Sequence, residues 1–171
     1  IVLLKDLFKQ SVEKVASIMS EKNPDVAARE DVAEAVGVGA IVFNYLFNSR
    51  IKDINFSLDQ ALSFEGNTGP YVQYTAARIK SVLRKGGEPA NYTIGEINED
   101  EYQLISTLSN FPDVVKAAAE KLEPFYVTRY AIEVASLFNK FYFNCKIIGE
   151  DKNTESFRLD ICKATLTVIS N

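Results

Sequence analysis

Apolar residues recur at three- and four-residue spacing along almost the whole chain, which is typical of amphipathic helices. Spacing, prolines and a capping pattern predict helices over residues 5–21, 26–50 and about 71–85, from Asn98 to about Ser109, from Pro112 to about Leu122, from Pro124 to Cys145, and after the GEDKN loop. Asn23 and Pro24 fit an N-cap followed by a first helical position. Residues 53–58, DINFSL, alternate polar and apolar side chains and predict the only strand.

These elements predict an all-α fold in which a bundle of five helices is preceded by two helices and a short strand. We place the boundary near residues 62–66, which divides the chain into segments 1–64 and 65–171. Gly37 and Gly39 interrupt the long apolar run, and they indicate either close packing of two helices or a break in the helix. A phosphate-binding loop would need more glycine and a flanking strand.

Composition excludes several kinds of chemistry. The chain has no histidine, which rules out a Ser-His-Asp or Cys-His nucleophile and any histidine-based metal site. Cys145 and Cys162 lack metal-ligand spacing and are interpreted as reduced, buried thiols of a cytosolic protein. The sequence has no glycine-rich nucleotide motif and no apolar run long enough for a membrane span. A metal site or a general acid built from carboxylates stays open, although the acidic residues do not cluster along the sequence. We expect no catalytic centre, no metal and no membrane contact.

The predicted helix at about 71–85 has an unusual charge pattern. Advancing about 100° per residue puts one set of apolar side chains on a core-facing arc: Val72, Ala76, Ile79 and Leu83. A second arc beside it carries Tyr71, Tyr74, Arg78 and Lys85, while Gln73, Lys80 and Arg84 flank the far side of the core arc. The window has four basic residues and no acidic one, although the whole chain has a net charge of −4.

Tyrosine beside arginine on an exposed face is the chemistry that binds single-stranded RNA. Aromatic rings stack on splayed bases, and guanidinium groups pair with phosphates or base edges. From the pattern alone, a basic helix with a solvated face and half-buried tyrosines stays open as the alternative. A second aromatic segment, residues 125–145, is mostly core by its spacing, although Arg129, Lys140 and Tyr142 can turn outward. The acidic overall balance indicates selective contact with one RNA feature.

Three separate segments, in the same order along the chain, resemble one family. LSFEGNTGPYVQYTAARIKSVLRK (62–85) is similar to the opening of the DALR anticodon-binding domain of arginyl-tRNA synthetases. EDVAEAVGVGAIVFNYL (30–46), with KNPDVAARE (22–30) before it, resembles the segment that precedes this domain. LEPFYVTRYAIEVASLFNKFYFNC (122–145) resembles its later long helix.

The resemblance implies the helical anticodon-binding bundle of class Ia aminoacyl-tRNA synthetases at 65–171, and a connecting segment at 1–64 that follows the catalytic domain and contacts the tRNA stem. It implies an arginine–tRNA ligase that uses ATP with Mg²⁺ in the full-length protein, in the cytoplasm and as a monomer. The chain opens at Ile1 without methionine and stops within an uncapped helical run, so we expect it to be an excised piece of a longer protein. By the resemblance, this piece binds arginine-specific tRNA, uses no cofactor and catalyses nothing itself.

The same resemblance implies four residues that face the anticodon loop: Tyr74, Arg78, Arg84 and Tyr142. Tyr71 and Lys85 share the arc of Tyr74 and Arg78, so we add them to the predicted tRNA-binding set. From the helical pattern, we expect the Tyr74 ring and the Arg78 guanidinium to project side by side into solvent. The family often has histidine where this chain has Ala76. A helical protein-interaction module that binds an acidic partner is the alternative function.

Overall fold

The computed structural model describes residues 3–22 and 29–171, and all regular structure in that part of the chain is helical. The elements are α1 (Leu4–Lys22), α2 (Glu30–Leu46), α3 (Leu58–Ala61), α4 (Gly69–Gly86), α5 (Glu99–Ser109), α6 (Phe111–Lys121), α7 (Phe125–Asn144) and α8 (Lys152–Ser170). The predicted all-α class is confirmed. The expectation for Asn23 and Pro24 lies outside the described residues.

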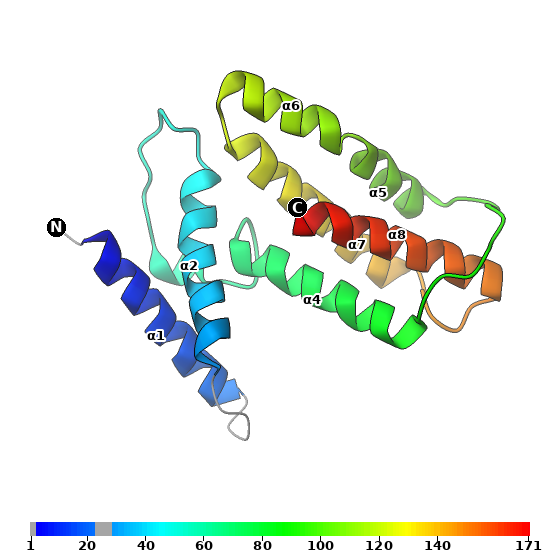
Figure 1. Cartoon of the computed structure of the whole chain (residues 1–171), viewed down its shortest axis with the longest axis horizontal. Helices are drawn as coiled ribbons and strands as arrows, with labels where there is room; N and C mark the ends of the chain where they lie inside the picture. Colours follow the sequence, from blue (N-terminus) through cyan, green and yellow to red (C-terminus); the bar gives the residue numbers. More distant parts are fainter. Residues whose placement is uncertain (1–2, 23–28) are drawn as a thin grey trace.

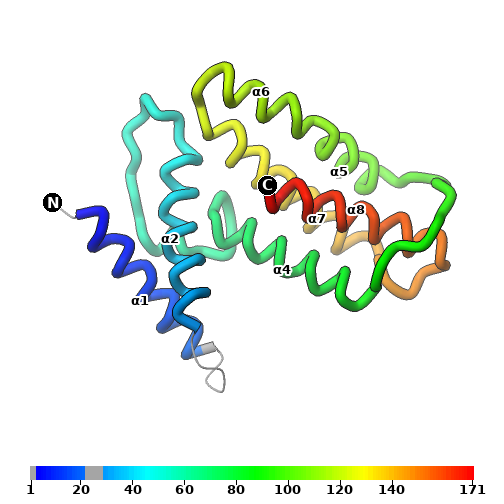
Figure 2. The backbone as a smooth tube through the Cα atoms, viewed as in Figure 1, coloured from blue at the N-terminus to red at the C-terminus, as the bar shows by residue number. Residues whose placement is uncertain are grey.

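The helices form a hairpin joined to a bundle (Figure 1). α1 and α2 pack against each other, and α2 also contacts α4. α4 lies beside α7 and α8, while α5 and α6 cover another side of α7, as the tube trace in Figure 2 also shows. Each part has its own apolar cluster: Val15, Ala33, Ala40 and Leu62 in the hairpin, and a larger one around Ile79, Leu104, Val134, Phe138, Phe141 and Leu159 in the bundle.

Local capping explains where the bundle helices begin. Thr68 accepts a hydrogen bond from the Tyr71 backbone N–H and starts α4 at Gly69, two residues before the predicted start. The capping box predicted at the start of α5 is present, because Asn98 and Glu101 accept hydrogen bonds from each other's backbone N–H groups at 3.0 and 2.9 Å. The Asp151 side chain caps α8 by accepting hydrogen bonds from the backbone N–H groups of Asn153 and Thr154.

The glycines in α2 serve close packing and do not break the helix. A Cβ atom at Gly37 would lie 3.0 Å from the backbone of Ser11, whose hydroxyl donates to the Gly37 carbonyl at 2.8 Å. At Gly69, a Cβ atom would lie 3.0 Å from Phe43 and 3.3 Å from the Gly39 carbonyl oxygen. Small residues therefore let α2 approach α1 on one side and the start of α4 on the other.

The predicted strand at 53–58 is wrong. Residues 53–57 have no regular secondary structure, and Ser57 caps the short helix α3, which includes Leu58. A strand needs a partner for its backbone groups, and no segment among the described residues provides one. Phe56 instead stacks on Tyr45 of α2, with ring centroids 5.7 Å apart. The alternation of polar and apolar residues therefore reflects one-sided packing of a loop.

The buried face of α4 is rotated slightly from the predicted arc. Val72 and Ile79 are buried as expected, but Ala76 and Leu83 are only half-buried. Thr75 and Val82 are buried instead. Thr75 faces α7, where its hydroxyl accepts a hydrogen bond from Asn139, and it also donates to the Tyr71 carbonyl within α4. A satisfied threonine hydroxyl can thus occupy a core position that periodicity gives to an apolar residue.

Candidate functional site

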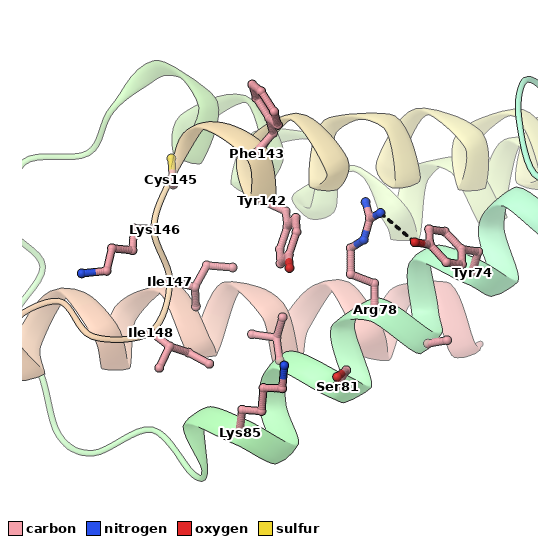
Figure 3. Close-up of a pocket in the computed structure, with 12 residues that line it drawn as sticks. Tyr74, Arg78, Ser81, Lys85, Tyr142, Phe143, Cys145, Lys146, Ile147 and Ile148 are labelled. Carbon is pink, nitrogen blue, oxygen red and sulfur yellow. Dashed lines mark hydrogen bonds between the residues drawn. The ribbon is translucent and has the colours of Figure 1, made fainter.

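An open groove of about 740 Å³ lies where α4 faces the end of α7 and the segment that follows it (Figure 3). Its lining comes from α4, from α7 and from residues 145–148: Tyr74, Ala77, Arg78, Ser81, Val82, Lys85, Tyr142, Phe143, Cys145, Lys146, Ile147 and Ile148. We call this feature the α4–α7 groove. It combines aromatic rings, positive charge and an apolar floor.

The centre of the groove is a sandwich of one guanidinium between two tyrosine rings. The Cζ atom of Arg78 lies 4.8 Å from the ring centroid of Tyr74 and 5.0 Å from that of Tyr142. Arg78 also donates from Nη2 to the Tyr74 hydroxyl at 3.1 Å. Tyr74 and Tyr142 remain 48% and 42% exposed, so much of each ring is free to meet a ligand. Cation–π contacts of this kind hold the three groups together.

Arg78, which extends from α4, is anchored by a side chain of α7. Its Nη1 donates to Oδ1 of Asn139, whose Nδ2 donates to the Tyr71 hydroxyl at 3.1 Å and to Thr75 Oγ1 at 2.9 Å. Arg78 is therefore half-buried, whereas the sequence predicts a guanidinium in solvent. Tyr74 has the predicted exposure. The two side chains do lie together, but only the tyrosine is exposed.

The charge along the groove is positive. None of the residues that line it in the described part of the chain is acidic. Lys85 is exposed, and no hydrogen bond or ion pair joins its ammonium to any residue that the structure describes. Lys146 donates to the Gly149 carbonyl at 2.8 Å and lies 3.8 Å from Glu150. Lys85 is thus the lining cation best able to take a new anionic partner.

The far wall of the groove is fixed by a buried ion pair. Arg158 of α8 donates from Nη1 to the Lys146 carbonyl at 2.7 Å and from Nε to Glu101 at 2.7 Å. The Glu101 side chain is only 2% exposed and that of Arg158 16%. Cys145 is buried in the same wall, and its burial raises the pKa of the thiol, so it stays neutral. The wall is therefore a rigid part of the bundle.

Four of the six predicted residues line the groove: Tyr74, Arg78, Lys85 and Tyr142. Tyr71 is half-buried behind the sandwich, where it accepts from Asn139, and it borders a separate hollow with Glu65 and Ile132. Arg84 is exposed outside the groove, with a long 3.5 Å hydrogen bond to Ser81.

Phe143 and Lys146 line the groove but are not among the predicted site residues. Phe143 is 89% exposed and points away from α4, while its neighbour Tyr142 points toward α4 (Figure 3). The run of aromatic residues at the end of α7 could have indicated that Phe143 is exposed, because consecutive positions of a helix cannot all face the core. Lys146 follows the helix, so periodicity gives no indication of its place.

Among the described residues, no group of three or more cysteine and acidic side chains could hold a metal ion. No helix in the described part of the chain is long and apolar enough to cross a lipid bilayer.

Comparisons with known proteins agree with this geometry. Residues 72–171 match the family described as the DALR anticodon binding domain. The arginine–tRNA ligase of Clostridium beijerinckii is 45% identical over 174 residues, and that of Clostridium botulinum strain 657 is 47% identical over 175. Each alignment covers 100% of this chain and 31% of the relative, so the chain spans about a third of the length of these proteins.

A solved structure supports the same relationship. The arginyl-tRNA synthetase of Thermus thermophilus superposes with a TM-score of 0.90 and 31% identity over 98% of this chain and 30% of its own. The helical arrangement of both the hairpin and the bundle is therefore shared with that enzyme. On the family match and this agreement, the chain belongs to the DALR anticodon-binding family, and its longer relatives are arginine–tRNA ligases.

Proposed function

We propose that the chain is the anticodon-recognition part of an arginine–tRNA ligase, and that the α4–α7 groove receives unstacked bases of the anticodon loop. The observation that carries this proposal is the sandwich of Arg78 between the half-exposed rings of Tyr74 and Tyr142. Single-stranded RNA is bound by aromatic and guanidinium planes on which splayed bases stack. The groove offers such planes on both of its long sides.

The surrounding groups fit an RNA loop. Lys85 lines the groove and its ammonium has no ion-pair partner among the residues that the structure describes, so a phosphate can approach it. Phe143 is almost fully exposed and points away from α4, so it offers a further stacking surface to RNA that extends beyond the sandwich. Because no lining residue among those described is acidic, the RNA backbone meets no like charge there. We assign the direct contacts to Tyr74, Arg78, Tyr142 and Lys85, and give Tyr71 a supporting role behind them.

Arg84 contributes differently in this proposal. Its side chain is exposed on α4 but outside the groove, so it can reach only RNA that continues past the groove. It is thus an accessory phosphate contact of the loop or the stem, with a smaller effect than Lys85.

In the whole protein, we propose that this part positions the tRNA while arginine is ligated to its acceptor end with ATP and Mg²⁺. The described residues offer no cluster of acidic side chains that would hold the metal ion. We therefore assign no step of the ligation to this chain, and only binding to its side chains. Residues 1–64 would connect this bundle with the rest of the protein, which is supported by their separate apolar cluster.

The experiment is a titration of the chain with an arginine tRNA and with a non-cognate tRNA, in the same buffer. The proposal predicts tighter binding of the arginine tRNA, and retention of the preference by a stem-loop RNA that carries only the anticodon arm. Equal, weak binding of both tRNAs would contradict the proposal and favour a module that binds an acidic protein partner.

A further inference from the structure

Asn139 lies on α7 directly behind the sandwich and uses both ends of its amide. Its Oδ1 accepts from Nη1 of Arg78, and its Nδ2 donates to the hydroxyls of Tyr71 and Thr75. Asn139 is half-buried and does not line the groove. All three of these partners are on α4, so one amide on α7 sets the position of side chains from the opposite helix.

We propose that Asn139 is a positioning residue that holds the Arg78 guanidinium between the rings of Tyr74 and Tyr142, and so preorganises the groove for RNA. This inference rests on the proposed function. A free arginine side chain samples many rotamers, and ordering it on binding lowers the affinity. In this chain the ordering is already complete, because Arg78 is fixed by Asn139 on one side and by the Tyr74 hydroxyl on the other.

The hydrogen bonds to Asn139 and to the Tyr74 hydroxyl also determine which groups of Arg78 remain available to RNA. Two of its N–H groups are directed to protein acceptors, and its Cζ atom lies 4.8 and 5.0 Å from the centroids of the two tyrosine rings. It therefore acts as one layer of a fixed stack, whose remaining N–H groups can pair with a base edge. Without the Asn139 acceptor, the guanidinium would be free to leave the rings and pair with phosphates, and the stack would lose its middle layer.

The test compares Asn139→Leu with Thr75→Val. The first removes the acceptor of Arg78. The second removes one of the two acceptors of the Asn139 Nδ2 group, together with the Thr75 hydrogen bond to the Tyr71 carbonyl, and leaves the Arg78 contact in place. We expect Asn139→Leu to weaken binding of the anticodon stem-loop about tenfold, the effect of one hydrogen bond to a charged group. We expect Thr75→Val to change it by less than about twofold. The thermal midpoint of each variant is measured alongside.

A double-mutant cycle separates positioning from a general structural role. In the Arg78→Ala background, Asn139→Leu should produce no further loss of affinity, because the residue it positions is gone. If Asn139→Leu fails to fold, Asn139→Ala removes the same amide without adding apolar bulk, and the cycle is run with it.

The outcomes distinguish the inference from the function on which it rests. If Arg78→Ala weakens binding while Asn139→Leu binds like the wild type, the proposal that Asn139 positions Arg78 is wrong, and the proposal that the α4–α7 groove binds RNA is retained. An equal loss from Asn139→Leu with and without Arg78 likewise overturns positioning and makes Asn139 merely structural. If the wild-type chain binds neither the arginine tRNA nor its stem-loop, both proposals fall together.

Discussion

Arg78 and Lys85 carry the same charge on the same helix, but their different surroundings suit them to different contacts with RNA. Arg78 is half-buried, clamped by Asn139 and stacked on two rings, whereas Lys85 is exposed without a partner among the described residues. A compact ammonium on a flexible stem is suited to phosphates, while a planar guanidinium is suited to stacking. The sequence places both on one arc of a helix, but it cannot reveal Asn139, which lies 61 positions further along the chain from Arg78.

Lys85→Gln tests the assignment of the phosphate contact. We expect RNA binding to weaken, and the slope of log affinity against log salt to become shallower by about 0.7, the value for one phosphate of a single strand. The measurement is a salt titration of stem-loop binding. Lys116→Gln is the matched control, because Lys116 is an exposed lysine of α6 outside the groove. An unchanged slope for Lys85→Gln would show that this ammonium meets no phosphate.

At the scale of elements, most helices follow directly from periodicity and caps. Four bundle helices begin and end within a few residues of their predicted bounds, and the fifth follows the GEDKN loop as predicted. Thr68, Asn98 and Asp151 cap three of the five at their N-termini. The prediction of a strand at 53–58 was wrong because alternating polar and apolar residues form a strand only where a second strand pairs with them. The wall at residues 145–148 could not be predicted at all, because it depends on Arg158 reaching across from α8 to the Lys146 carbonyl.

Arg158→Met tests the buried pair that fixes this wall. The change leaves Glu101 buried at 2% exposure without its cation, and we expect the free energy of unfolding to fall by about 3 kcal/mol. Urea denaturation at neutral pH measures this difference. Lys116→Met breaks a 4.0 Å pair with Glu120 whose side chains are 72% and 65% exposed, and it should change stability little. Equal stability of the two variants would show that the Arg158 pair does not hold the bundle.

At the scale of the whole molecule, two apolar clusters are joined through the close approach of α2 and α4. The larger cluster packs α4, α5, α7 and α8 together, which places the groove on a rigid base. The division at residues 64 and 65 stays a prediction. Helix membership could be predicted from the sequence, but the pairing of α4 with α7 could not, since it depends on contacts between segments more than 60 positions apart.

The reactivity of the two cysteine thiols measures whether the bundle as a whole is folded. Both are buried, and burial raises the pKa of Cys162 from 9.0 to about 12. The native thiols should therefore react with a disulfide reagent at pH 8 only after unfolding, and reactivity should rise in urea along with loss of helix. Since the unfolded thiol ionises near its usual pKa, the contribution of Cys162 to stability should fall between about pH 9 and pH 12. Rapid labelling of the folded chain at pH 8 would contradict this packing.

The most direct test of RNA recognition by the groove is the affinity of the anticodon stem-loop for Tyr142→Ala compared with Tyr102→Ala. Tyr142 is one ring of the sandwich, whereas Tyr102 is a 62% exposed tyrosine of α5 outside the groove. Loss of one stacked base should weaken binding by about 1–3 kcal/mol for Tyr142→Ala and leave Tyr102→Ala like the wild type. Equal affinities of Tyr142→Ala and the wild type would contradict the account.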